Sequence, residues 1–537
     1  MVQVIKIKSI IIYALAIAAL FACGFGFMVF KNNENLAVVT AAFIDSGSLL
    51  GDYLKLVERG KFDQAFMYHT SIYGWPGNSL SIWVLWLAEN TSFATKAAIA
   101  RSLSFIMSIL SLVCLGVLLT RINANKVMSV VILLFVALWA PFVVFSYQIH
   151  PEAFGLLFGS ISLIACADYE HSHRHRSLLI GWAMALLAFL SKQPFLIYLI
   201  VPLYLGTRTL IVSTGKIRVF LIHALTFTCV ALVTVFISDP YIILDFSGFL
   251  EKQIAIHTHH LDISNSLSYS AGQWTRIIVF SEPWFLIALA ASLIVFFRST
   301  SQFLKACALA NFAFLIVLIC LLKFFFIRSY LYPVLPASIV VIVTAPALVP
   351  RILKLPVYLI FIISIAVLAA YNILNTFGTV ASASSFSQTS AVETMNEISS
   401  QATNTMTAIY SANLPLDSAP FEKTYNSFQF TAENTVSEIQ KIKPDIIIID
   451  KLWSYNDPKL YETAARQLGL VKFTVNRAPE AAMCDYQGES SFADCLSALL
   501  GERGSTPAPV YEIYVDRNEI QLLKFIKGDV RELGTAY

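Results

Sequence analysis

Ionisable residues are scarce in this chain, so carboxylates beside apolar runs are the first candidates for chemistry. Asp45 lies in the first polar segment after the first long apolar run, within NLAVVTAAFIDSGSLLGDY. A partly buried carboxylate there could act as a base toward a hydroxyl group, because burial raises its proton affinity. Asp is also a good helix N-cap, and SLLGDYLKL can follow it as a helix, so capping is the alternative role.

Three cations lie at the ends of other apolar runs and could hold an anion such as a phosphate. Lys192 lies between two such runs, where a lysine is costly and is a functional candidate by default; the alternative is snorkelling to the interface. Arg328 could grip a phosphate through two hydrogen bonds, or could serve as an interfacial anchor. Lys323 is the weaker candidate, because a lysine at the end of an apolar run usually snorkels.

Several further polar and aromatic side chains could contact a substrate. Glu152 follows His150 and Pro151 and could hydrogen-bond a sugar or cap the next helix. The cluster HTHHLD has a spacing that could bind zinc, although such a cluster is more often a solvated loop or a substrate contact. We therefore predict no metal ligands, while a divalent metal remains possible. The candidate substrate contacts are Tyr73, Trp75, Glu152, His257, His259 and Tyr330.

The composition indicates a polytopic helical membrane protein. Of the 537 residues, 57% are hydrophobic and 13% are charged, whereas a soluble domain carries about 25% charged residues. The mean hydropathy is +0.69. The net charge of +3 is too small to suggest a nucleic-acid partner. The partner that the composition does imply is the lipid bilayer.

Eleven apolar runs are candidate membrane spans, each needing about 20 residues. The first has no clear cleavage site, so we expect a retained helix rather than a signal peptide. The runs lie near 10–30, 93–120, 127–146, 152–169, 177–191, 194–212, 217–238, 283–298, 303–325, 331–349 and 354–376.

Basic residues fall in alternate connections between these runs. Arg121 and Lys126 lie in one such connection, and Arg351 and Lys354 lie in another. The positive-inside rule therefore predicts a multi-pass plasma (inner) membrane protein with a cytoplasmic N-terminus. The remaining polar sequence falls outside, including a first outer loop at 31–92 with interfacial helices and a second at 239–282.

Residues 377–537 lose the membrane composition and predict an extracytoplasmic α/β domain, separate from the transmembrane domain at 1–376. A Ser-rich and Thr-rich linker at about 377–400 precedes alternating patterns. TMTAIYSA, DIIIID, VKFTV and VYEIYV are typical of strands, whereas TVSEIQKI and PKLYETAARQL are typical of helices. Cys484 and Cys495 are the two cysteines outside apolar runs and could form a disulfide in an oxidising compartment.

The order of several motifs resembles the GT-C superfamily of membrane glycosyltransferases, in the branch with protein O-mannosyltransferases and the lipid A aminoarabinose transferase. Asp45 precedes Gly60 by fifteen residues, as the family's catalytic Asp does, although Ser46 and Leu49 replace the Glu and Tyr of its D-E-x-x-Y pattern. Asp52, followed by Tyr53, is the second choice. The segments that carry the rest of the resemblance are SIYGWPGNSLSIW, LLAFLSKQPFLIYLIVP, SDPYIILDFSGF and IRSYLYPVLPA.

The resemblance implies a GT-C-like fold and transfer of a sugar from a polyprenyl-phosphate-linked donor to a lipid, glycan or protein acceptor on the outer face. It implies Asp45 as the base, inversion at the sugar, and Lys192, Arg328 and Lys323 on the phosphate. The C-terminal α/β domain shows no Gly-rich nucleotide loop, consistent with a donor that is not a nucleotide sugar. The alternatives are a transporter or flippase of a lipid-linked or small polar substrate, and a membrane-anchored sensor or scaffold.

Overall fold

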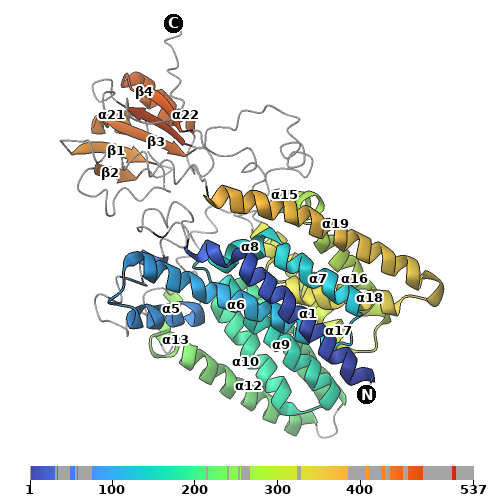
Figure 1. Cartoon of the computed structure of the whole chain (residues 1–537). Helices are drawn as coiled ribbons and strands as arrows, with labels where there is room; N and C mark the ends of the chain where they lie inside the picture. The colour runs from blue at the N-terminus through green and yellow to red at the C-terminus, as the bar shows by residue number, and fades with distance from the viewer. Residues whose placement is uncertain are drawn as a thin grey trace.

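A computed structural model describes a helical bundle followed by a small sheet (Figure 1). The structure describes residues 2–30, 33, 49–51, 53–54, 57, 75–212, 216–238, 241–248, 250–251, 254, 266–322, 328–384, 405–410, 425–429, 436–450, 458–475 and 511–515.

The first half of the bundle forms from long apolar segments separated by short polar caps. Ser92 caps α6 by accepting a hydrogen bond from the Thr95 N–H, and Asn125 caps α7 through the N–H groups of Val127 and Met128. The elements are α1 (Val2–Phe25), η1 (Gly26–Phe30), α5 (Trp75–Leu87), α6 (Phe93–Arg121), α7 (Lys126–Leu138), α8 (Ala140–Tyr147), α9 (Glu152–Ser172) and α10 (His175–Ser191).

The second half packs beside the first and ends in a long helix. Its elements are η2 (Gln193–Leu199), α11 (Ile200–Val212), α12 (Lys216–Ser238), α13 (Tyr241–Leu244), α15 (Leu267–Arg276), η3 (Ile277–Ser281), α16 (Trp284–Arg298), α17 (Gln302–Cys320), η4 (Arg328–Leu331), α18 (Leu335–Leu348) and α19 (Arg351–Ser384). The last helix extends past residue 376, where we expected the linker to begin, so at least residues 377–384 are helical.

All eleven predicted apolar runs coincide with helices in the described residues. Within the described part of the chain, six helices are long and apolar enough to cross a membrane, or up to eight if each of two bent pairs is one span. Three shorter apolar helices account for the runs near 177–191, 331–349 and 354–376. The chain is therefore a polytopic helical membrane protein, and the count of eleven crossings stays a prediction.

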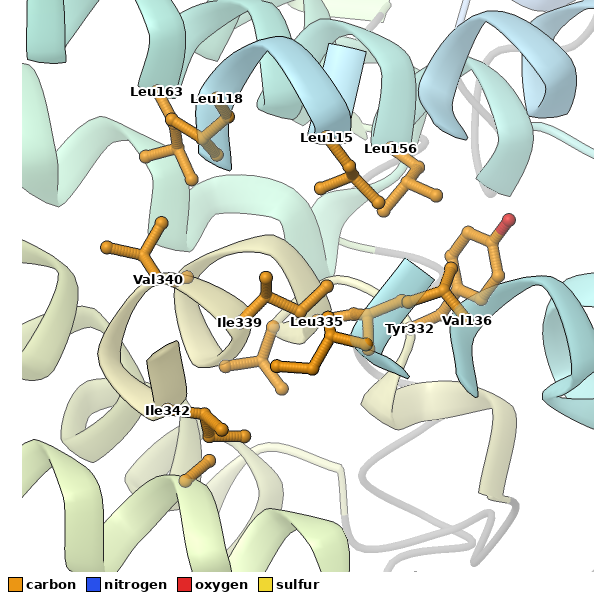
Figure 2. Close-up of a cluster of buried hydrophobic side chains, with 14 of the residues drawn as sticks. Leu115, Leu118, Val136, Leu156, Leu163, Tyr332, Leu335, Ile339, Val340 and Ile342 are labelled. Carbon is orange, nitrogen blue, oxygen red and sulfur yellow. The ribbon is translucent and has the colours of Figure 1, made fainter. Parts of the chain in front are cut away.

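The core of the bundle surrounds α18, which is mostly apolar and buried along almost its whole length. Figure 2 shows Leu335, Ile339, Val340 and Ile342 of this helix among side chains from α6, α7 and α9. In contrast, α12 exposes large apolar side chains such as Leu225 and Ile237, which suits a surface that faces lipid. The helices packed around α18 include α9, which carries a candidate site residue, Glu152.

Ionic contacts between helix ends show which termini share one end of the bundle. Arg121 Nε lies 3.2 Å from Asp168 Oδ1, which joins the C-terminal ends of α6 and α9. Glu170 accepts hydrogen bonds from the N–H groups of Gln302 and Phe303, so the N-terminus of α17 lies there too. We call this the basic end. The opposite end, the Glu152 end, holds the N-termini of α6 and α9.

The C-terminal region forms a five-stranded mixed sheet, which Figure 1 shows beyond the end of α19. The strands are β1 (Met406–Tyr410), β2 (Tyr425–Gln429), β3 (Ile446–Asp450), β4 (Val471–Val475) and β5 (Tyr511–Val515), in the order β2-β1-β3-β5-β4. β1 pairs in parallel with β2 and β3, while β5 is antiparallel to β3 and β4. Helices α21 (Val436–Ile442) and α22 (Pro458–Gln467) contribute Ile439, Ala464 and Ala465 to its core.

Both predicted helices and four of the five strands agree with the sequence patterns, which confirms the α/β character of this region. The strand that sequence reasoning missed is β2, because YNSFQ mixes aromatic and polar residues without a clear alternation. The Cys484–Cys495 prediction lies outside the described residues. The six cysteines in the described helices are free thiols.

Candidate active site

A buried carboxylate with two nitrogen partners lies at the Glu152 end of the bundle. Glu152 is the first residue of α9, and its side chain is 3% exposed. Its Oε1 atom contacts Lys192 Nζ, and its Oε2 atom contacts His150 Nδ1. Because N-cap residue Pro151 precedes it, Glu152 is not the capping residue that we gave as its alternative role. The carboxylate instead joins two chain segments forty residues apart.

Lys192 reaches this position because the chain breaks between α10 and η2. Its backbone is extended, and Pro194 follows at the start of η2. The segment can pack closely on α9 because Gly155 faces the Phe195 ring; an added Cβ would lie 2.7 Å from that ring. The lysine side chain is only 13% exposed. A buried lysine of this kind needs an anionic partner, which Glu152 supplies.

Aromatic rings line both nitrogen groups of the cluster. The His150 ring stacks on Phe145, with centroids 4.9 Å apart. Lys192 Nζ lies 5.5 Å from the centre of the Tyr330 ring, within the range of a cation–π contact. Tyr330 belongs to η4, so three segments of the chain meet at Lys192. The rings lower the local polarity and strengthen charge interactions among the ionic groups.

Arg101 is a second buried cation near this end, and sequence reasoning missed it. It lies in α6, its side chain is 3% exposed, and it is close enough to Tyr147 to interact electrostatically. Ser104 and Ser108 follow on the same face of the helix, and Ser108 donates to the Ser104 carbonyl. A charged residue within an apolar run was the available signal. We had treated 93–120 only as a span.

The segment that follows Asp45 packs beside the same turn. Leu49, Leu50, Tyr53 and Val57 are buried in one cluster with Ile149, the residue before His150. The Tyr53 hydroxyl donates to Asn78 Oδ1 of α5, which is also buried. Residues close to Asp45 in sequence therefore lie next to the turn that carries His150 and Glu152. Asp45 itself and Asp52 lie outside the described residues.

The described residues bring together three of the predicted site residues, Lys192, Glu152 and Tyr330. The backbone of Arg328 is described two residues before Tyr330, and Trp75 is the first residue of α5. The side chains of both are outside the description. The other predicted site residues also lie outside it, namely Tyr73, His257, His259 and Lys323. Among the described residues, no cluster of three or more His, Cys, Asp or Glu side chains could hold a metal ion.

The fold and the site define a polytopic helical membrane protein with a buried carboxylate–cation cluster at one end of its bundle. No family model matches the sequence, and a search of curated proteins finds no relative. Among solved structures, the chain is similar to the crystal structure of ArnT from Cupriavidus metallidurans bound to undecaprenyl phosphate. The identity is 14%, the match covers 87% of this chain and 96% of that chain, and the TM-score is 0.46. Because this likeness is distant, function has to be inferred from the residues of the chain itself.

Proposed function

We propose that this chain is a glycosyltransferase that moves a sugar from a polyprenyl-phosphate-linked donor to an acceptor on the outer face of the membrane. The observation that carries the proposal is the position of Lys192. This cation is nearly buried at one end of a membrane bundle, where it meets a carboxylate and an aromatic ring. Such a position suits the phosphate of a lipid whose chain lies in the bilayer.

Transfer of this kind needs stabilisation of the departing phosphate. As the bond between the anomeric carbon and the phosphate oxygen breaks, the polyprenyl phosphate gains negative charge. Preorganised cations at low polarity stabilise that charge better than water does. We assign this role to Lys192, with Arg328 and Lys323 as further phosphate contacts. Arg101 adds positive charge from within the bundle.

The acceptor hydroxyl needs a base, and we assign that role to Asp45. The oxygen of the acceptor hydroxyl attacks the anomeric carbon from the face opposite the phosphate, and the proton of that hydroxyl passes to the Asp45 carboxylate. Attack from the opposite face inverts the configuration at that carbon. The packing of Leu49 and Tyr53 against the turn before His150 supports a position for Asp45 near Lys192. Asp52 is the second candidate for the base.

The basic end of the bundle supports the predicted orientation. Arg121 and the N-terminus of α17 lie at that end, opposite Glu152. Under the positive-inside rule we expect Glu152 and Lys192 on the outer side of the membrane, and we propose the same side for the C-terminal sheet. A reporter fused after Tyr537 should be active outside the cell, and cytoplasmic activity would contradict this orientation.

A transporter or flippase is the second candidate, and the bent helices favour it. The α7–α8 pair bends by 56°, and the pair formed by Leu267–Val279 and Trp284–Arg298 bends by 96°. Broken helices often hold ion or substrate sites in transporters. Here, however, both breaks meet at Glu282, whose carboxylate accepts hydrogen bonds from the indoles of Trp139 and Trp284. These hydrogen bonds join the two breaks to each other and favour a structural role for the bent helices.

An assay with a radiolabelled donor distinguishes sugar transfer from transport. The purified protein in lipid vesicles is given a polyprenyl-phosphate sugar, and release or transfer of the sugar is followed for wild type, Asp45→Asn and Asp52→Asn. Loss of a general base typically costs about 10²–10⁴-fold in rate, so Asp45→Asn should lose that much and Asp52→Asn much less. The reverse order would assign the base to Asp52. Movement of intact donor across the vesicle without chemistry would favour transport.

A further inference from the structure

The Glu152 carboxylate has two nitrogen partners, Lys192 and His150. The proposed function requires Lys192 to bind the phosphate of the donor as well. Lys192 contacts Oε1 while His150 contacts Oε2. If the phosphate of the donor draws Lys192 toward itself, Glu152 loses its permanent cation. An unpaired carboxylate that is 3% exposed is strongly unfavourable, so something must replace that charge.

His150 is the group in position to do so. Its Nδ1 atom already contacts Glu152, and its ring is held by stacking on Phe145. Imidazole is also the side chain that gains and loses a proton near neutral pH. A protonated His150 beside Glu152 would restore an ion pair without moving the backbone.

Other charged and titratable side chains described around this turn also have contacts of their own. On α6, Arg101 interacts with Tyr147 of α8. On η4, Tyr330 faces the ammonium group of Lys192 through its ring. On η2, the Tyr198 ring packs against Gly159 of α9, one turn further into the bundle than Gly155. Among the described histidines, His150 is the one whose ring contacts Glu152.

We propose that His150 is a positioning residue that takes up one proton when the donor's phosphate displaces Lys192 from Glu152. This inference rests on the proposed function. In the free protein, Glu152 pairs with Lys192 and His150 is neutral. In the donor complex, Lys192 pairs with the phosphate, and the imidazolium of His150 pairs with Glu152. The proton comes from water, and no covalent bond changes in this step.

The consequence is a donor affinity that depends on pH. Because binding takes up a proton, the donor binds more tightly as pH falls, by up to about tenfold per unit while His150 is neutral in the free protein. Free imidazole titrates near pH ~6.5, so a range of about pH 5.5–8.5 should show the slope. At high pH the extra proton is unavailable, and the contribution of His150 disappears.

The test measures the dissociation constant of a polyprenyl-phosphate sugar across that range for wild type, His150→Gln and Glu152→Gln. The donor is a phosphodiester, so its charge stays constant, whereas a phosphate monoester would itself titrate near pH ~6. Wild type should show the slope. His150→Gln should bind with an almost constant affinity that equals the wild-type value at high pH and is at least about tenfold weaker at low pH.

The two variants distinguish positioning from simple damage to the fold. Glu152→Gln removes the carboxylate that needs a cation, so its donor affinity should also be independent of pH. A His150→Gln protein that keeps the wild-type slope, or a Glu152→Gln protein that does so, would overturn the inference. Absence of donor binding to wild type at every pH would instead contradict the proposed function. Binding without any slope would contradict the role of His150 alone.

Discussion

Two buried glutamates in this bundle occupy similar places but have different partners. Glu152 follows a proline at the start of α9, and Glu282 precedes a proline at the start of α16. They are 3% and 2% exposed. Glu152 contacts a lysine and a histidine, whereas Glu282 accepts hydrogen bonds of 3.0 and 2.6 Å from the indoles of Trp139 and Trp284.

Under the proposed function, this difference distinguishes a carboxylate of the site from one that holds helices together. The indole N–H groups of Trp139 and Trp284 do not ionise at ordinary pH, and their rings pack against each other, so pH does not change these donors of Glu282. Lys192 can exchange its partner when another anion arrives, and His150 can change its charge. Burial alone therefore does not identify a site in this protein. The chemistry of the partners does.

The largest expected effect is on transfer rate when Lys192 is neutralised. Lys192→Gln removes the cation nearest the proposed phosphate, and loss of one preorganised group that stabilises transition-state charge typically costs about 10²–10³-fold. Sugar transfer from labelled donor is the measurement. Glu282→Gln, assayed per mole of folded protein, should retain most of the wild-type rate. Equal losses in both variants would remove the distinction between the two glutamates.

A smaller loss should follow from displacing Lys192 without changing it. Gly155→Ala places a Cβ 2.7 Å from the Phe195 ring and pushes η2 away from α9. Overpacking of this kind costs about 1–3 kcal/mol in stability, and transfer should slow because Lys192 moves with η2. Thermal unfolding and transfer rate are measured together.

The matched control for this variant is Gly24→Ala in α1, where an added Cβ has open space. It should be neutral or stabilising by up to about 1 kcal/mol. If Gly155→Ala is equally harmless, close packing of η2 is not what positions Lys192.

Particular residues of the bundle show which features of the fold and of the site could be predicted from the sequence. Composition and hydropathy located the long apolar helices of the described bundle, because membrane burial demands long continuous runs. The length of α19 was underestimated, because the Ser-rich and Ala-rich residues up to Ser384 continue a helix already begun. Lys192 and Glu152 were each singled out, yet their contact depends on packing between α9 and η2. Arg101 was missed although a charge within an apolar run is a signal, and the contact of Glu282 with Trp139 depends on packing between segments distant in sequence.

The smallest effect expected is on stability at the bent helices. Glu282→Gln keeps the shape of the side chain but removes the charge that strengthens both indole hydrogen bonds. We expect a loss of about 1–3 kcal/mol in the free energy of unfolding, seen as a lower melting temperature. Glu89→Gln in the exposed turn that follows α5 is the control and should change stability by no more than about 0.5 kcal/mol. A stable Glu282→Gln protein that has lost its activity would suggest a functional role for this carboxylate.

The most direct test of the account is the affinity of the lipid-linked donor itself. Binding of a polyprenyl-phosphate sugar is compared at one pH for wild type, Lys192→Gln and Lys96→Gln, a partly exposed lysine near the N-terminus of α6. A hydrogen bond to a charged group contributes about 1.5–3 kcal/mol, so Lys192→Gln should bind at least about tenfold more weakly while Lys96→Gln stays close to wild type. Unchanged affinity in Lys192→Gln would contradict a phosphate site at the Glu152 end.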